Sequence, residues 1–304
     1  MGARVGLSVD FEPGPDLPRW LAPELPFRRG VARLGGHRIH YVDEGEGPAV
    51  LLVHGNPSWS FLWRKVIRAL RPDHRCVAPD LLGLGLSDKP RNPGAHQLDL
   101  HVALICKLVV ALDLRDIVLV GQDWGGPIAM GVGLREPDRV QGIVAGNTAV
   151  IPPRRPVHAK AFHRFAHLPV VSDLVFRGLN FPIPVMRRTQ GEVGGFRRRT
   201  LRAYWWPLRR LRDRAAPLGL ARMVPDRDDH PSLPLIDAIG HWVQGWDGPA
   251  ALVWGTQDPI LGRGLRRHRE ALPQARVFET AAGHFSQEEI PAVWAEAIRG
   301  VAAD

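Results

Sequence analysis

The chain has very little cysteine. Cys76 and Cys106 are its two cysteines among 304 residues, too few for a disulfide framework, and they lack metal-ligand spacing. Each lies in an apolar run, HRCVAP or ALICKLVV, so we expect two buried, unreactive thiols. The sequence therefore argues against a disulfide-stapled secreted fold and against a cysteine-based metal centre.

Long apolar runs are also missing. No stretch approaches the roughly 18 uninterrupted apolar residues of a membrane-spanning helix, and the N-terminal sequence MGARVGLSVDFEPGPDLPRW has no apolar core typical of a signal peptide. Repeats, heptads and low-complexity tracts are absent too. We expect a soluble protein of a reducing compartment, the cytoplasm, without stable membrane insertion.

Lysine is scarce, with four residues at positions 65, 89, 107 and 160, so the net charge of +9 comes almost wholly from arginine. An arginine excess can attract anionic partners, although it can also reflect composition alone. No nucleic-acid-binding motif accompanies the charge, and we predict no nucleic-acid partner. With 45% hydrophobic and 23% charged residues, the chain can bury a sizeable core.

Apolar runs that end in glycine or a polar residue alternate with helical patterns along most of the chain. Residues 37–44 alternate like a strand with one exposed face, and helices are expected around residues 60–70 and 96–112. This order predicts an α/β fold with a mainly parallel sheet, whose ligands gather at the carboxyl ends of the strands. The further expected strands are residues 49–55, 74–80, 116–123, 141–147, 251–258 and 275–284.

A middle section interrupts this alternation. Between Arg154 and Arg214 it holds 15 Arg or Lys residues against three acidic residues, together with many prolines and aromatic clusters. We expect a helical insertion that sits as a lid over the site. Trp205 and Trp206 are expected to pack in the core of this lid, with the lining of the pocket as the alternative. The predicted division is residues 1–149 and 233–304 for the α/β core and residues 150–232 for the lid.

The sequence GQDWGG at 121–126 directly follows a buried strand and precedes a helix. This pattern is typical of a nucleophile elbow, in which glycines permit a sharp turn that exposes the central side chain. Here that side chain is Asp123, which could otherwise be a helix N-cap. A carboxylate nucleophile attacks saturated carbon and forms an ester, which water must then cleave with the help of a general base.

The base and its acidic partner are expected downstream of the elbow in this fold. His284 follows a strand and a glycine, where it would activate water. Asp258 closes the buried strand ALVWGTQD and would hold the histidine tautomer, with Asp247 as a weaker rival.

Two further residues are placed to bind negative charge. Asn56, in the loop HGNPSW, and Trp124, after the nucleophile, could form an oxyanion hole with their backbone N–H groups. Their side-chain N–H groups are also donors, and two donors beside a carboxylate suit a departing halide. No residue pattern calls for a metal or an organic cofactor.

With these motifs the sequence resembles the haloalkane dehalogenases of the α/β-hydrolase superfamily from about Leu25 to the C-terminus. The resemblance implies displacement of halide by Asp123, ester hydrolysis by His284, and halide binding by Asn56 and Trp124. The segments that carry the resemblance are HGNPSWSFLWR (54–64), APDLLGLGLSDKP (78–90), GQDWGGPIA (121–129), VWGTQDPI (253–260) and AGHFSQEE (282–289).

The resemblance also bears on the acid of the triad, on the partners of the protein and on two supporting residues. Some family members place a glutamate after the preceding strand, where this chain has Asn147, which leaves Asp258 as the acid. An Asp acid with an Asn–Trp pair resembles a subfamily whose members often self-associate, so self-association stays open. The implied partners are a small apolar halogenated substrate, water and the halide product. His54 and Asp80 lie in family motifs and are expected to support the loops.

Three alternatives remain open. An epoxide hydrolase shares the Asp elbow but normally needs two lid tyrosines, whereas this chain has Tyr41 in an early strand and Tyr204 in the lid. A fluoroacetate dehalogenase needs arginines near the nucleophile, and the elbow has none. A hydrolase fold that only binds a ligand or an anionic surface is the non-catalytic alternative, against which the complete triad argues.

Overall fold

One sheet organises the described part of the chain. The computed structural model describes residues 9–152, 155–157, 161–191 and 197–303. Their strands form a nine-stranded sheet in the order β1-β2-β3-β5-β4-β6-β7-β8-β9. The pairs from β5–β4 to β8–β9 are parallel, and β1, β2 and β3 join antiparallel. The strands are β1 (Phe11–Pro13), β2 (Arg29–Leu34), β3 (His37–Glu44), β4 (Ala49–Val53), β5 (Arg75–Pro79), β6 (Ile117–Asp123), β7 (Val140–Thr148), β8 (Ala250–Gly255) and β9 (Arg276–Thr280).

The central strands are apolar along their whole length. Every residue of β4 and β8 is buried, and β6 is buried up to its last residue. Such strands need cover on both faces, because successive side chains point to opposite sides of a sheet. The predicted α/β fold with a mostly parallel sheet is confirmed.

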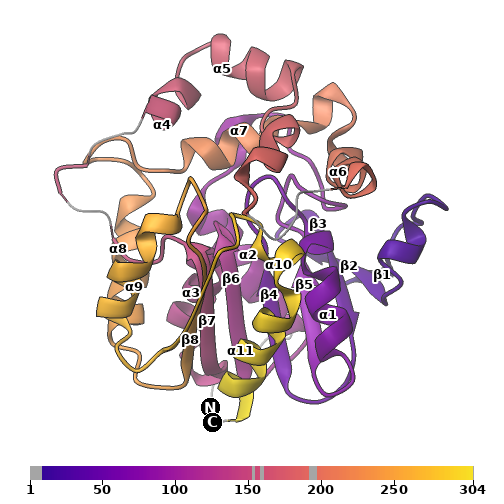
Figure 1. Cartoon of the computed structure of the whole chain (residues 1–304). Coiled ribbons are helices and arrows are strands. Elements are labelled where there is room, and N and C mark those ends of the chain that lie inside the picture. Colours follow the sequence, from indigo (N-terminus) through magenta and orange to yellow (C-terminus); the bar gives the residue numbers. More distant parts are fainter. Residues whose placement is uncertain (1–8, 153–154, 158–160, 192–196, 304) are drawn as a thin grey trace, which may run out of the picture.

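Helices supply this cover on the two faces of the sheet (Figure 1). On one side α1 packs against α11, and Trp63 meets Trp294 edge to face with ring centroids 5.1 Å apart. On the other side α3 lies between α2 and α8. No helix in the described ranges is long and apolar enough to cross a membrane. These core helices are α1 (Arg64–Leu70), α2 (Leu98–Ala111), α3 (Gly125–Arg135), α8 (Leu233–Gln244), α9 (Leu265–Ala271), α10 (Ser286–Glu289) and α11 (Pro291–Ala303).

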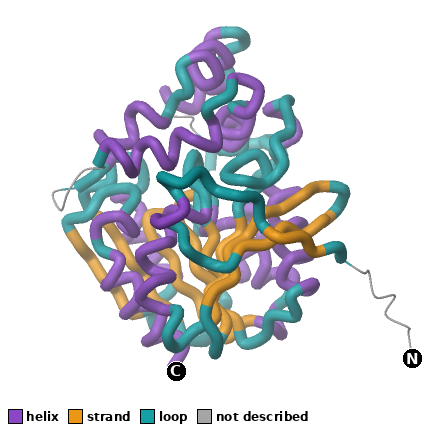
Figure 2. The backbone as a smooth tube through the Cα atoms, turned by 90° about the vertical axis from the view of Figure 1, so that its right-hand side faces the viewer, coloured by secondary structure: helices purple, strands orange, loops and turns teal. Residues whose placement is uncertain are grey.

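A second layer of short helices lies between β7 and α8 in the sequence. Figures 1 and 2 show these helices gathered beyond one end of the sheet. They have a small apolar cluster of their own, made of Ala166, Phe176, Leu218 and Ala221. The main elements of this layer are α4 (Ala161–Ala166), α5 (Val171–Asp173), η5 (Leu174–Gly178), η6 (Ile183–Thr189), α6 (Arg198–Trp205), η7 (Trp206–Leu208), η8 (Leu211–Asp213) and α7 (Ala215–Arg222).

The N-terminal part departs from the sequence prediction in two ways. The structure adds β1 and β2, which the apolar pattern did not indicate, because β1 is mostly exposed and only half of the residues of β2 are buried. The exposed face expected for β3 is also wrong: Ile39 to Val42 are all buried. The strand lies inside the sheet between β2 and β5, and Nδ1 of its buried His40 is bonded to Asp80 Oδ2 at 2.8 Å.

Candidate active site

Asp123 lies at the tip of a sharp turn between β6 and α3. Its φ angle is +52°, a left-handed conformation that is uncommon outside glycine. The turn is so tight that a Cβ on Gly125 would approach the carbonyl oxygen of Val53 to 2.0 Å. The glycines of the motif are thus required by close backbone contacts, and the structure gives Asp123 the elbow geometry that the sequence predicts.

The Asp123 carboxylate is held by backbone donors. The N–H of Asn56 donates to Oδ1 at 2.8 Å, and the N–H of Trp124 is a second backbone donor to the same carboxylate. Burial raises the pKa of Asp123 above its ordinary value, although these donors and His284 oppose the shift. Because the carboxylate is poorly solvated and its Oδ1 is fixed by a hydrogen bond, its Oδ2 is free to act as a nucleophile.

His284 lies beside this carboxylate and is bonded to Asp258. Its Nδ1 is 2.8 Å from Asp258 Oδ2, and its Nε2 is 3.7 Å from Asp123 Oδ2. Burial disfavours the charged ring, but the two carboxylates outweigh burial and raise the pKa of His284 above its ordinary 6.5. The structure therefore brings together the three residues that the sequence predicts for a triad.

Gln122 fixes the tautomer of this histidine. Its side-chain Nε2 donates to the backbone carbonyl of His284 at 3.0 Å and lies 3.2 Å from the ring Nε2. Because the amide nitrogen is a donor, the ring Nε2 has a lone pair and Nδ1 carries the proton toward Asp258. A lone pair on the nitrogen that faces Asp123 is what a general base needs.

Asn147, at the end of β7, holds the acid in place. Its side-chain nitrogen donates to Asp258 Oδ2 and to the carbonyl of Gly255, both at 2.9 Å, and its oxygen accepts from the Gly255 N–H at 2.7 Å. Burial would raise the pKa of Asp258, but His284 and hydrogen-bond donors lower it overall. Sequence reasoning noted Asn147 merely as a missing acid; the signal for its role was its place on the strand between those of Asp123 and Asp258.

Asn56 and Trp124, whose backbone N–H groups bind the Asp123 carboxylate, also carry side-chain donors. Asn56 Nδ2 donates one hydrogen bond of 3.0 Å to the carbonyl of Pro217, in α7 of the upper layer. An amide nitrogen carries two N–H groups, so one stays available to an anion. Trp124 is buried at the N-terminus of α3, where the helix dipole also favours negative charge.

His54 and Asp80 support the loops around this site. His54 Nε2 accepts from the N–H of Leu81 at 2.9 Å, so its Nδ1 carries the proton that faces the carbonyl of Gly55. Asp80 is fully buried and accepts from the N–H groups of Ser60 and Leu86, each at 2.7 Å. Despite burial, its neighbours lower the pKa of Asp80 to about 2. Neither residue touches Asp123 in the hydrogen bonds described, which agrees with the expected supporting role.

The two tyrosines do not offer an epoxide-opening pair. Tyr204 is fully buried and its hydroxyl donates to Glu288 Oε1 at 2.7 Å, while Arg64 donates to the other oxygen of Glu288 at 2.8 Å. Tyr41 lies in β3 against β2. The expected burial of Trp205 is wrong, since its side chain is 42% exposed.

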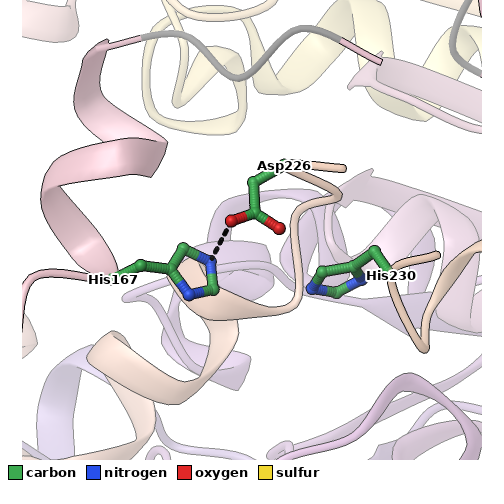
Figure 3. Close-up of side chains that lie close together, drawn as sticks. All are labelled: His167, Asp226 and His230. Carbon is green, nitrogen blue, oxygen red and sulfur yellow. Dashed lines mark ion pairs between the residues drawn. The ribbon is translucent and has the colours of Figure 1, made fainter. Parts of the chain in front are cut away.

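One group of described residues has the composition of a metal site. His167, Asp226 and His230 offer ligand atoms within 4.8 Å of one another, and Figure 3 shows Asp226 pointing toward His167. However, His230 Nδ1 accepts from the N–H of Ser232 at 3.1 Å, so its Nε2 carries the proton that faces the carbonyl of Arg222 at 3.0 Å. This ring has no free lone pair for a metal, and we assign none to the group.

Known proteins share both this sequence and this fold. Residues 48–291 match the family described as the alpha/beta hydrolase fold. Haloalkane dehalogenase 2 of Mycobacterium tuberculosis is 37% identical over 291 residues, 94% of this chain and 96% of the relative. The cis-3-alkyl-4-alkyloxetan-2-one decarboxylase of Shewanella oneidensis is 30% identical, covering 87% and 85%.

A solved structure is similar in the same way. The tetrameric haloalkane dehalogenase DpaA of Paraglaciecola agarilytica superimposes with a TM-score of 0.78 at 25% identity, covering 95% of this chain and 97% of that chain. The sequence relatives and this structure thus agree on the family to which the chain is similar. The chain belongs to the haloalkane dehalogenase family of the α/β hydrolases.

Proposed function

We propose that this chain hydrolyses the carbon–halogen bond of apolar haloalkanes to an alcohol, a halide ion and a proton, without a metal or an organic cofactor. The observation that carries the proposal is the carboxylate at the elbow: Asp123 accepts from two backbone donors, and its Oδ2 faces His284. A serine at this position would perform acyl transfer, whereas a carboxylate is suited to displacement at saturated carbon.

In the first step Asp123 Oδ2 attacks the carbon that bears the halogen. The new C–O bond forms as the carbon–halogen bond breaks, and the halide leaves with the bonding electrons. The remaining N–H of the Asn56 side chain and the indole N–H of Trp124 stabilise the departing halide. Poor solvation of Asp123 helps, because water does not have to be removed from the attacking oxygen.

In the second step water cleaves the alkyl ester. His284 Nε2 takes a proton from the water, whose oxygen attacks the ester carbonyl, and Asp258 stabilises the resulting imidazolium. In the resting site the N–H of Asn56 holds Oδ1 and the N–H of Trp124 donates to the same carboxylate, so both donors are placed to stabilise the negative charge that develops on the ester carbonyl oxygen. The tetrahedral intermediate collapses as the ester C–O bond to the alkyl group's oxygen breaks, and His284 gives its proton to the leaving alkoxide, which departs as the alcohol. The proton left on the Asp123 carboxyl group is then lost to solvent, which restores the carboxylate.

Halide release from the purified full chain tests this reaction. Brominated and iodinated alkanes are offered to the wild type, to Asp123→Ala and to the matched control Asp247→Ala. Asp247 lies outside residues 150–232, and it is exposed to solvent. We expect release by the wild type and the control, and a loss of at least about a thousandfold in Asp123→Ala. Equal release by all three proteins would refute the role of Asp123.

A second reaction is favoured by the Shewanella relative. An oxetan-2-one ring, like a haloalkane, has a saturated carbon that bears a leaving group, here the ring oxygen, which attack by Asp123 would release as a carboxylate. That carboxylate would then leave as carbon dioxide while its electrons form a carbon–carbon double bond and the Asp123 carboxylate departs, so the products are an alkene and carbon dioxide. The same three proteins are therefore given a cis-3,4-dialkyl oxetan-2-one and assayed for carbon dioxide. Asp123-dependent carbon dioxide without halide release would assign the chain to that chemistry instead.

The lid and the surroundings belong to the same proposal. Residues 150–232 would act as the lid, with Pro217 bonded to Asn56 beside the site, and residues 1–149 and 233–304 as the core.

Self-association is supported by the tetrameric DpaA structure and is tested by analytical ultracentrifugation. Two buried free thiols suit a reducing compartment, in agreement with a cytoplasmic location.

A further inference from the structure

The positive charge of this protein is concentrated in one region. Residues 150–232 contain 17 Arg or Lys against 6 Asp or Glu, a net charge of +11. The rest of the chain contains 23 basic and 25 acidic residues, a net charge of −2. The reaction proposed above needs no cation from this region, so the charge calls for a separate explanation.

The same region carries an exposed apolar surface at its apex. Seven of the ten large apolar side chains that are strongly exposed in the described part of the chain lie in this region. One of them is Trp205, and the other six are each between 49% and 78% exposed. Figure 1 shows α5, which carries part of this surface, at the end of the molecule farthest from the sheet. We call these residues the lid-tip patch: Leu168, Val170, Val171, Leu174, Leu179 and Leu211.

Beside this patch lies a pocket rich in cations. It is a cavity of about 370 Å³ between the loop that follows β5 and the segment η7–η8. The Lys89 ammonium donates to the carbonyl groups of Gly85 at 2.6 Å and Ser87 at 3.1 Å, so among the described contacts it bonds to carbonyl groups rather than to a carboxylate. The charged residues that line this basic pocket are Lys89, Arg91, Arg209 and Arg212, with Asp88 and Asp213.

Patch and pocket belong to one continuous structure. Leu211 of the patch and Arg212 of the pocket are neighbours in η8, which packs against η5. Arg214 ties η5 to η7, because its guanidinium donates to the carbonyl of Arg177 at 2.8 Å and to that of Leu208 at 2.8 Å. Apolar side chains and cations are therefore presented together on a fixed frame.

We propose that the apex of the lid docks on the surface of an anionic lipid bilayer. The lid-tip patch enters the boundary between head groups and acyl chains, and the basic pocket holds a lipid phosphate. A second copy of the chain fits this surface less well, because two regions of +11 would face each other. Docking would place the site beside a phase in which apolar substrates concentrate, whichever of the two reactions it catalyses.

Vesicle sedimentation with the purified full chain tests the proposal. The vesicles contain phosphatidylcholine alone, or phosphatidylcholine with about one third phosphatidylglycerol, whose anionic surface attracts basic segments. We expect at least about tenfold tighter binding to the anionic vesicles at low salt. About 1 M salt shortens the Debye length to about 3 Å and should remove most of this difference.

Two double variants address the two parts of the surface. Leu174→Asn with Leu179→Asn should weaken binding at least about tenfold, because apolar burial in the interface is lost. Arg209→Gln with Arg212→Gln should weaken it about fivefold for each arginine. Matched controls on the core are Val110→Asn in α2, whose side chain is 46% exposed, and Arg115→Gln, whose side chain is 60% exposed. All substituted positions other than Arg209 are strongly exposed, and circular dichroism checks the folding of each variant.

Three results would overturn docking on lipid. Equal binding to both vesicle types would show that anionic lipid is not recognised. Equal losses in the core controls would show that the lid apex is not the contact surface. Absence of vesicle binding, together with oligomers that dissociate in the leucine variant, would assign the lid-tip patch to self-association. None of these readouts depends on halide release, so failure of docking and failure of the proposed reaction are distinguishable.

Discussion

The carboxyl end of the sheet and the lid above it are built by different means. At the sheet, Asp258 and His284 are buried at the ends of core segments, and Asn147 binds Asp258 and both backbone groups of Gly255. In the lid, the separate apolar cluster contains just four fully buried residues in the described segments. Arginines such as Arg214 complete the lid by donating to backbone carbonyl groups.

The difference in construction between sheet and lid matches two different roles, catalysis at the sheet and covering of the site by the lid. Chemistry needs side chains held within a few tenths of an ångström, which rigid strand ends with shared hydrogen bonds provide. A cover with an exposed surface needs less precision, and long arginine side chains can span its short helices. Substitutions at the sheet should therefore change the reaction, whereas substitutions in the lid should change stability or surface binding.

The largest effect that bears on this comparison is expected at the acid. Asp258→Ala should lower halide release on the order of a thousandfold, because His284 loses the partner that fixes its tautomer and stabilises its charge. Asp247→Ala, the rival acid, should stay within about twofold, since its side chain is exposed. Steady-state halide release measures both. Comparable losses in the two variants would contradict the assignment of Asp258.

A smaller effect is expected at Asn147. Asn147→Ala removes a hydrogen bond to a charged group and should lower kcat by about ten- to a hundredfold, with KM little changed. Asn147→Asp keeps the acceptor for the Gly255 N–H but adds a negative charge beside Asp258, which should raise the pKa of His284 further. A pH profile of kcat that does not move upward in Asn147→Asp would argue for a purely structural role.

The pH dependence should separate the two chemical steps. His284 must be neutral to act as a base, and its pKa is raised above 6.5, so ester hydrolysis should slow about tenfold per pH unit below that pKa. Alkylation uses Asp123 and does not need a neutral histidine. Rapid-mixing assays at mildly acidic pH should therefore show an initial burst of halide followed by slow turnover. If the burst and the steady state declined in parallel, His284 would also be needed for the first step.

The smallest effect on the reaction is expected in the lid. Tyr204→Phe removes a buried hydrogen bond to Glu288 and should lower the free energy of unfolding by about 1–2 kcal/mol. Halide release should stay within about threefold, because Tyr204 is bonded to Glu288 rather than to Asp123. Denaturant unfolding and halide assays on the same preparation check both values. A loss of activity as large as that of Asp258→Ala would erase the contrast between lid and sheet.

The sequence predicts the site residues better than it predicts their surroundings. Asp123 ends the buried strand β6, Asp258 lies three residues beyond the end of the buried strand β8, and the elbow glycines mark a tight turn, so local patterns identify them. The contact between Asn147 and Asp258 joins residues 111 positions apart and depends on β7 lying between β6 and β8, which no local pattern reveals. In the same way, the exposure of Trp205 depends on how short lid helices pack, where apolar residues have no fixed period.

Trapping the ester in His284→Phe tests the central claim most directly. The variant keeps Asp123 and its two backbone donors but lacks the base, so exposure to an alkyl bromide should add one alkyl group to the peptide that contains Asp123. Mass spectrometry of the digested protein locates this group, and the double variant with Asp123→Ala should remain unmodified. A protein that releases halide while Asp123 stays unmodified, or that carries the alkyl group elsewhere, would contradict covalent catalysis by Asp123.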